Sequence, residues 1–368
     1  MKILQIVKYY DPCQGGMESV VKNIVEGVVE ISDESNFTVY SNNHLRNFSK
    51  ETKLFNRIVV VKEATPFYLK SQPLNLRYPS LKKLIKDNDV IHHHYPFPTM
   101  EFTLLRYLKK IGNKKFIITW HANIRNSRWS WIEHIYNPMI EKLLERADAI
   151  IVTSPQLLEA SDILKKYQHK VKVIPLSFDS KYSLYESKKY PENRCFQLLF
   201  VGKLRKYKGV EYLIKAIETL DVKLTIVGNG EEQSNLEELV NVLNIKDKVC
   251  FITNASDEKL TEIYSSSDLF ILPSINEAEA FGVVQLEAMA NGLPVINTNL
   301  DSGVPFVSLN NYSGITVEPK NTAGLKLAIE KIISDKPLYE HFSSNSLERV
   351  KLFAREKMSE AYLSLYKN

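Results

Sequence analysis

Cysteine is scarce in this chain of 368 residues, and Cys13, Cys195 and Cys250 lie far apart with no CxxC pair. This spacing excludes a disulfide scaffold and a cysteine-ligated zinc site, and it favours a reducing compartment. Apolar runs stay well below the roughly 18 residues of a membrane span, so we expect no spanning helix. Met1 leads directly into a strand-like run without a leader pattern, so we expect a cytoplasmic protein.

A strong excess of either charge is also absent. The 48 lysines and arginines nearly balance 43 aspartates and glutamates, and the basic residues are spread along the chain. This spread does not favour a nucleic-acid partner, whereas the net charge of +5 permits an anionic ligand or membrane surface. The length and the ordinary share of hydrophobic residues predict a globular protein of two domains.

Short apolar runs alternate with helical patterns in the first half of the chain. The expected strands are 3–7, 37–40, 58–61, 89–92, 116–119, 149–153 and 172–174. Apolar residues recur at helical spacing in 20–28, 103–111 and 135–147. Such alternation indicates an α/β fold with a mostly parallel sheet covered on both faces.

The polar segment 179–194 lacks periodicity and contains Pro191, so we expect it to link two domains. Alternation then resumes, with a helix at 210–220 and strands at 196–201, 223–227, 249–252, 269–272 and 295–297. The last segment, 338–368, is predicted to be helical and to cross back to the first domain. The expected domains are residues 1–178 with about 350–368, and residues 195–349. Two doubly wound halves typically bind a ligand in the cleft between them.

The strongest motif runs from Glu279 to Val295 and reads EAFGVVQLEAMANGLPV. It places Glu279 in a loop, Gly282 at the turn into a helix, and Glu287 inside that helix. A glycine permits close backbone approach to a ligand, and the amides of Val283 and Val284 suit an anion. A carboxylate at Glu287 suits the vicinal hydroxyls of a ribose. The alternative is an ordinary amphipathic helix with two solvated carboxylates.

This motif resembles the signature of retaining glycosyltransferases of family four, and the resemblance covers nearly the whole chain. It implies the GT-B fold, with two Rossmann-like doubly wound domains facing a central cleft. It also implies that Glu287 holds the ribose and that Glu279 lies beside the donor sugar. The amides from Phe281 to Val284 would bind a sugar hydroxyl and the diphosphate. The run 303–308 is similar to a bacterial subgroup that transfers mannose or rhamnose in surface polysaccharide assembly.

A second motif, GKLRKYKG at 202–209, follows the expected strand 196–201. Cations just before a helix suit a diphosphate, because positive charge and free amides converge there. The family usually has Arg where this chain has Lys203. The lysine cannot form the two parallel hydrogen bonds of a planar guanidinium, and Arg205 is a candidate to supply them instead. The resemblance implies that Lys203 and Lys208 neutralise the departing diphosphate, with no metal or other cofactor required. The alternative is a solvated basic loop.

Several smaller features follow expected strands. In the family, the loop that contains Gly15 and Gly16 faces the donor phosphates and the acceptor, and His121 resembles the histidine near the sugar C6 hydroxyl. Gly228 and Asn254 are candidates to approach the nucleotide and its base, with a simple turn as the alternative at Gly228. The remaining histidines, His92, His93 and His94, are expected at the end of a strand and lack a zinc-ligand pattern.

Two further clusters are ambiguous. The triplet Asp87-Asn88-Asp89 matches a metal-binding DxD pattern, but it directly precedes a strand, so we expect a structural role. The segment 125–131 contains Arg125, Arg128, Trp129 and Trp131, which suit an anionic membrane surface or a lipid-linked acceptor. A packed aromatic pair with solvated arginines is the alternative.

Together these features predict an enzyme that transfers a hexose from a nucleoside diphosphate sugar to a hydroxyl of a glycan or lipid-linked glycan. The resemblance implies retention of the anomeric configuration. The basic and aromatic segment 125–131, with Lys109, Lys110, Lys114 and Lys115 in the same half, would suit peripheral contact with the inner face of the cytoplasmic membrane. GDP-mannose is the first expected donor and a UDP-hexose the second. A non-catalytic sugar-nucleotide binding protein is the alternative from another class, and the missing GxGxxG disfavours a dehydrogenase.

Overall fold

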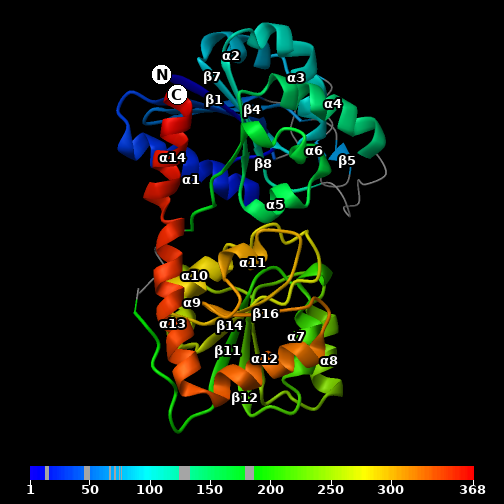
Figure 1. Cartoon of the computed structure of the whole chain (residues 1–368). Coiled ribbons are helices and arrows are strands. Elements are labelled where there is room, and N and C mark those ends of the chain that lie inside the picture. Colours follow the sequence, from blue (N-terminus) through cyan, green and yellow to red (C-terminus); the bar gives the residue numbers. More distant parts are fainter. Residues whose placement is uncertain are drawn as a thin grey trace. The chain divides into compact units, whose positions relative to one another are not determined.

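The computed structural model describes residues 1–12, 16–44, 50–65, 68–69, 72–73, 75, 77–123, 133–178 and 186–368. The chain divides into two compact units (Figure 1). The N-terminal unit consists of Met1–Leu176 together with Arg355–Asn368, and the C-terminal unit consists of Ser177–Ala354. The C-terminal segment therefore belongs to the same unit as the start of the chain.

The N-terminal unit is built on a sheet with the strand order β10-β9-β8-β7-β1-β2-β4-β3, parallel throughout except for the β3–β4 pair. Its strands are β1 (Lys2–Ile6), β2 (Asn36–Asn42), β3 (Glu51–Phe55), β4 (Ile58–Glu63), β7 (Val90–Tyr95), β8 (Lys115–Trp120), β9 (Ala149–Val152) and β10 (Val171–Val173). The central strands β7 and β9 are buried along their whole length, because helices cover a parallel sheet on both faces.

The helices of this unit are α1 (Gly16–Ile31), α2 (Leu81–Asp87), α3 (Pro98–Ile111), α4 (Glu133–Arg146), α5 (Pro155–Glu159), α6 (Asp162–Lys165) and α14 (Arg355–Lys367). A separate small pair joins β5 (Tyr68–Leu69) to β6 (Gln72–Pro73). The C-terminal helix α14 packs against α1 (Figure 1). A Cβ atom at Gly27 of α1 would lie 2.1 Å from Ser359 Oγ and 3.3 Å from Ser359 Cβ, so the two helices approach closely at this glycine.

The C-terminal unit is built on a parallel sheet with the strand order β13-β12-β11-β14-β15-β16. Its strands are β11 (Phe196–Val201), β12 (Val222–Val227), β13 (Val249–Ile252), β14 (Leu269–Ile271), β15 (Val295–Thr298) and β16 (Gly314–Val317). Its helices are α7 (Val210–Ala216), α8 (Gln233–Val242), α9 (Asp257–Ser266), α10 (Val284–Ala290), α11 (Val304–Val307), α12 (Thr322–Ser334) and α13 (Lys336–Val350).

The structure corrects several expected boundaries. The predicted helix 338–368 is two helices, because a 3-10 turn at Lys351–Phe353 buries Phe353 and the backbone is extended at Ala354. Helix α7 ends at Ala216 rather than at residue 220. Strands β3 and β16 were not expected: β3 is almost fully exposed, and β16 is a short strand that starts with glycine, so neither has a strong apolar pattern.

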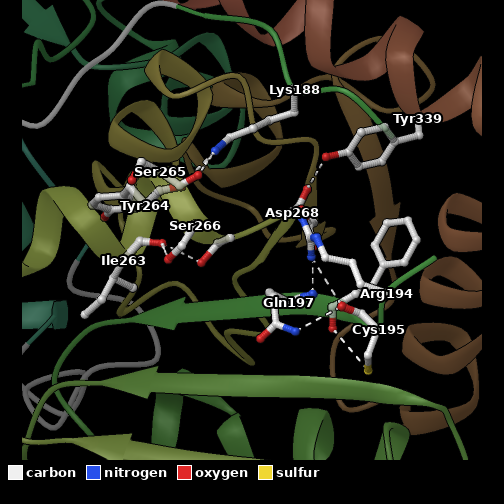
Figure 2. Close-up of polar contacts among 12 residues, drawn as sticks. Lys188, Arg194, Cys195, Gln197, Ile263, Tyr264, Ser265, Ser266, Asp268 and Tyr339 are labelled. Atoms are coloured by element: carbon white, nitrogen blue, oxygen red, sulfur yellow. Dashed lines mark hydrogen bonds and ion pairs between the residues drawn. The ribbon is translucent and has the colours of Figure 1, made fainter. Parts of the chain in front are cut away.

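The described part of the expected linker is held on the C-terminal unit. Both guanidinium nitrogens of Arg194 lie 2.6 Å from the carboxylate of Asp268, which also accepts from the Gln197 amide at 2.8 Å (Figure 2). The Lys188 ammonium donates to the carbonyls of Tyr264 and Ser265 at the end of α9. Residues 186–194 are therefore packed chain rather than a free connection.

Cys195 and Cys250 are free thiols, and Cys13 lies outside the described residues. In the described part of the chain, no helix combines the length and apolar character needed to cross a bilayer.

Candidate donor and sugar sites

The C-terminal site lies where the strand order reverses. From β11 the chain proceeds to β12 on one side of the sheet and later to β14 on the other, and ligands bind at such switch points in open α/β sheets. The loops after β11 and β14 are joined, because the Ile275 amide donates to the Tyr207 carbonyl at 2.8 Å. Gly209 has a φ of +64°, and a Cβ atom there would lie 2.2 Å from the Pro273 carbonyl oxygen.

This junction brings Lys208 and Glu279 together. The Lys208 ammonium donates to Glu279 Oε2, and the Ser274 hydroxyl donates to the same oxygen at 3.1 Å. Lys208 is 7% exposed and Glu279 is 8% exposed, so the ion pair is nearly removed from water. A buried charge that loses its partner is costly, so each member of the pair holds the other in place.

The other cations of the basic loop have a different environment. Lys203 and Arg205 are exposed, and neither packs into the core of the unit. A 3-10 turn at Lys206–Lys208 separates them from α7, so they precede the helix as the sequence predicts. Lys203 and Arg205 are therefore available to an anionic ligand at low desolvation cost, whereas Lys208 already neutralises Glu279.

The loop before α10 is packed so closely that it requires a glycine at position 282. Gly282 has a φ of +73°, and a Cβ atom there would lie 2.6 Å from Leu272 Cδ2 and 2.7 Å from Gln285 Nε2. Neither the Val283 amide nor the Val284 amide donates to a backbone carbonyl in the described residues. Phe281 is 3% exposed: its ring packs edge-on against Phe353, and its carbonyl accepts from Gln285 Nε2 at 3.3 Å.

Glu287 lies in the first turn of α10 and is half-buried. Its Oε2 atom accepts from the Tyr264 hydroxyl of α9 at 2.7 Å. Tyr264 is fully buried, so this contact fixes the carboxylate on a rigid element. The protein thus holds the Oε2 atom of Glu287 in place, and this contact orients the carboxylate towards the hydroxyl groups of a ligand.

Gly228 and Asn254 follow β12 and β13. Gly228 has a φ of +133°, and a Cβ atom there would lie 2.0 Å from the Gly202 carbonyl oxygen. Gly228 thus has a structural reason to be glycine, because it lets the loops after β11 and β12 touch. Asn254 is exposed at the end of β13.

The N-terminal unit has a buried histidine cluster at its own switch point, between β1 and β7. His94 Nδ1 lies 2.9 Å from His121 Nε2, and the two rings stack with centroids 5.2 Å apart. His121 directly follows β8 and is 8% exposed. Burial lowers the pKa of His121 to about 3, and it lowers the pKa of His92 and His94 well below the usual value.

The expected position of His92, His93 and His94 at the end of a strand is wrong. Strand β7 continues to Tyr95, so the three histidines lie inside it and are fully buried. They were misplaced because histidine is rarely a core residue, whereas here each ring has a polar partner. Alternation along β7 places His93 on the opposite face, where its Nε2 lies 2.8 Å from the buried carboxylate of Glu101.

The remaining predicted residues of this unit are placed only in part. Gly16 begins α1, and a Cβ atom there would meet nothing within 4 Å. The other predicted positions lie outside the described residues or side chains: Gly15, Arg125, Arg128, Trp129 and Trp131. Asp89 accepts from the Lys2 amide at 2.8 Å, as befits a residue that begins a strand.

A basic pocket lies between α2 and α3. Its volume is about 490 Å³, and it is lined by Pro79, Lys82, Lys83, Ile85, Lys86, Lys110 and Lys114. The Lys114 ammonium group donates to the carbonyl oxygens of Lys86 and Asn88, so it is already hydrogen-bonded to the protein backbone. Lys82, Lys83 and Lys86 are exposed. The sequence pattern did not predict this pocket.

Four residues near the candidate sites were also not predicted: Ser274, Tyr264, Gln5 and Tyr366. Each holds a predicted residue or its neighbour through a side-chain hydrogen bond. A polar residue within an apolar strand is the signal that identifies Gln5, since its side chain is fully buried. The others have ordinary helix or loop patterns and no such signal.

Comparison with known proteins agrees with this architecture. The family profile described as "Glycosyltransferase Family 4" matches residues 14–182, and the profile described as "Glycosyl transferases group 1" matches residues 186–349. O-antigen chain mannosyltransferase C of Escherichia coli is 26% identical over 375 residues, covering 100% of this chain and 98% of that protein.

D-rhamnosyltransferase WbpZ of Pseudomonas aeruginosa is 27% identical over 367 residues, covering 95% of this chain and 91% of that protein. Among solved structures, Anabaena Alr3699/HepE in complex with UDP aligns with a TM-score of 0.76 at 18% identity, covering 100% of both chains. The two α/β units with parallel sheets thus have the GT-B fold. The chain belongs to glycosyltransferase family four.

Proposed function

We propose that this protein transfers a hexose from a nucleoside diphosphate sugar to a hydroxyl of a glycan or lipid-linked glycan, with retention of the anomeric configuration. The observation that carries the proposal is the Lys208–Glu279 pair at the switch point of the C-terminal sheet, in the same unit as the anchored Glu287 carboxylate. The names of the O-antigen mannosyltransferase and the rhamnosyltransferase support surface polysaccharide assembly as the setting.

In this proposal, the C-terminal unit binds the donor. Glu287 accepts from the ribose hydroxyls, and the exposed Lys203 and Arg205 contact the diphosphate. The amides of Val283 and Val284 add donors that are preorganised by the backbone. Asn254 lies towards the base, and Gly228 contributes by allowing the loops beneath the nucleotide to touch.

The reaction breaks the bond between the sugar anomeric carbon and the diphosphate oxygen, and it forms a bond from that carbon to the acceptor oxygen. The acceptor proton passes to the departing phosphate on the same face. Lys208 and Lys203 stabilise the negative charge that develops on the diphosphate. Glu279 lies beside the donor sugar and keeps Lys208 in position before the donor binds. Gly16 and His121 of the N-terminal unit are assigned to the diphosphate and the sugar, respectively. All of these groups belong to the chain itself, and we propose that no metal is required.

GDP-mannose is the proposed donor, because one similar protein is named a mannosyltransferase. A UDP-hexose is the second candidate, because Anabaena Alr3699/HepE was crystallised with UDP. The test is a panel of nucleotide sugars scored by thermal shift and then by release of the nucleoside diphosphate with an acceptor. NMR spectroscopy of the product assigns its anomeric configuration. A donor that binds without turnover with any acceptor would instead indicate a sugar-nucleotide binding protein.

We also propose peripheral contact with an anionic membrane through the basic pocket of α2 and α3. Lys82, Lys83 and Lys86 are exposed around an apolar floor that includes Ile85, which suits phosphate headgroups. Sedimentation with phosphatidylcholine vesicles that contain phosphatidylglycerol tests this contact. The double variant Lys82→Glu/Lys83→Glu should lose binding, and Lys172→Glu is the control. Equal sedimentation of all variants would contradict the contact.

A further inference from the structure

The histidine pair His94–His121 lies at one end of a longer chain of hydrogen bonds in the N-terminal unit. His94 Nε2 lies 2.8 Å from Gln5 Oε1, and Gln5 Nε2 donates to the Tyr366 hydroxyl at 2.8 Å. The Tyr366 oxygen lies 2.9 Å from His92 Nδ1. His92 Nε2 lies 2.7 Å from Thr119 Oγ1, whose oxygen lies 3.4 Å from the Tyr362 hydroxyl. The chain thus joins β1, β7 and β8 to the C-terminal helix α14.

With the Gln5 amide oriented as in the structure, the donors and acceptors of this chain run in one direction when the histidines are neutral. Gln5 Oε1 can only accept, so His94 Nε2 carries the proton, and a neutral His94 then accepts at Nδ1. His121 must therefore donate from Nε2. At the far end, Tyr366 accepts from Gln5 and donates to His92 Nδ1, so His92 donates from Nε2 to Thr119.

The surroundings keep these rings neutral. His92 and His94 are fully buried, and burial together with neighbouring histidines lowers the pKa of both far below neutrality. Each ring therefore has one N–H group. His121 Nδ1 has no partner among the described residues and is not fully buried. The unprotonated Nδ1 is the atom that His121 presents outward, as a hydrogen-bond acceptor.

We propose that Tyr366 and Gln5 are positioning residues that set the tautomer of His121, so that it accepts a hydrogen bond from the donor sugar through Nδ1. The C-terminal helix α14 thus has a role in the N-terminal unit besides packing. The assignment of the ligand rests on the proposed function, whereas the assignment of the tautomer rests only on the hydrogen-bond chain. Reversing the Gln5 amide would reverse every bond of the chain, including the bond between Tyr366 and His92, so the Tyr366 hydroxyl couples the orientation of the Gln5 amide to the proton position on His92.

The tautomer is measured by nitrogen-15 NMR of histidine-labelled protein at neutral pH, with His121→Gln used to assign the signals. The wild-type protein should show His121 protonated at Nε2 and unprotonated at Nδ1. The opposite tautomer would overturn the proposal without any variant. This measurement needs no substrate, so it decides the tautomer even if the protein proves not to transfer sugars.

The matched variants are Tyr366→Phe and Tyr362→Phe, which remove one hydroxyl each from the same buried face of α14. Tyr366→Phe leaves the Gln5 Nε2 group without its acceptor, so the amide can adopt both orientations. The variant should therefore give mixed His121 tautomers and reduce turnover about tenfold. Tyr362→Phe removes only the contact with Thr119, the last and longest of the chain, so it should preserve both the His121 tautomer and the turnover. Equal His121 spectra in the two variants would overturn the role of Tyr366. A shifted tautomer with unchanged turnover would overturn the positioning role.

Discussion

The two units place their candidate residues at equivalent points of their sheets but use opposite chemistry. In the C-terminal unit, the loops after β11 and β14 bring together a buried ammonium and a buried carboxylate, with exposed cations nearby. In the N-terminal unit, β1 and β7 carry neutral groups joined by directional hydrogen bonds. Charge acts strongly on a charged ligand, whereas neutral hydrogen bonds act mainly on orientation. In the proposed function, the cations of the C-terminal unit thus act on the charge of the diphosphate, whereas His121 of the N-terminal unit acts on the orientation of the sugar.

The largest expected effect concerns the ion pair of the C-terminal unit. Lys208→Met removes the buried ammonium, so turnover should fall by about 10²–10³-fold because the developing diphosphate charge loses its partner. It also leaves the Glu279 carboxylate buried without a cation, which should cost about 3–5 kcal/mol of unfolding free energy. Steady-state kinetics and denaturant unfolding measure the two effects.

Two matched variants separate catalysis from stability. The double variant Lys208→Met/Glu279→Gln removes both charges, so it should regain much of the lost unfolding free energy but not the turnover. Lys206→Met changes an exposed lysine of the same loop and should remain near wild type in both. Wild-type turnover in Lys208→Met would refute the role of Lys208 at the diphosphate.

The second effect concerns donor affinity. Glu287→Ala should raise the donor Michaelis constant by about 10–100-fold, because a hydrogen bond to a charged group is lost. Tyr264→Phe keeps the carboxylate but removes its anchor, so its increase should be only a few-fold. Measurement of the Michaelis constant across both variants tests the ribose contact. Unchanged donor kinetics in Glu287→Ala would contradict it.

A third prediction contrasts one glycine from each unit. Gly16→Ala adds a methyl group where the described structure is open, so unfolding free energy should change by less than about 1 kcal/mol while the donor Michaelis constant rises. Gly228→Ala places a methyl group 2.0 Å from a carbonyl oxygen, so it should lower unfolding free energy by at least about 2 kcal/mol. Unchanged donor kinetics in Gly16→Ala would remove Gly16 from the donor site.

The last prediction is a pH dependence that belongs to the N-terminal unit. The folded-state pKa of His92, His94 and His121 is lowered, so below the unfolded value near 6.5 the unfolded chain binds more protons. Unfolding free energy should therefore fall as the pH decreases from about 6.5 towards 3, by up to about 1.4 kcal/mol per pH unit for each histidine.

Denaturant unfolding at several pH values between 7.5 and 5 measures this slope (about the range in which histidine titrates). His94→Gln should reduce the slope by about one proton. His341→Gln, an exposed histidine of the C-terminal unit, should leave it unchanged. Equal slopes in the two variants would show that the buried cluster does not control the pH response.

Much of the fold was predictable from local patterns. Strands β11 and β13 have the predicted bounds, because their apolar runs are bordered by polar residues. The motif also predicted that Glu279 lies in a loop, Gly282 at the turn into a helix and Glu287 inside that helix, because these positions are close together in the chain. Strand β3 was not predictable, because its exposed side chains have no apolar pattern.

The sequence by itself determined the two parallel α/β halves, the glutamate motif and the loop that carries Lys208, because each depends on residues close together in the chain. Only the tertiary structure decided that Lys208 pairs with Glu279, 71 residues away, and that Tyr366 of α14 contacts Gln5 of β1, 361 residues away. Hydrogen bonds and ion pairs act over about 3 Å, so they depend on which strands become neighbours. That choice is made by the packing of the whole sheet, and no local pattern contains it.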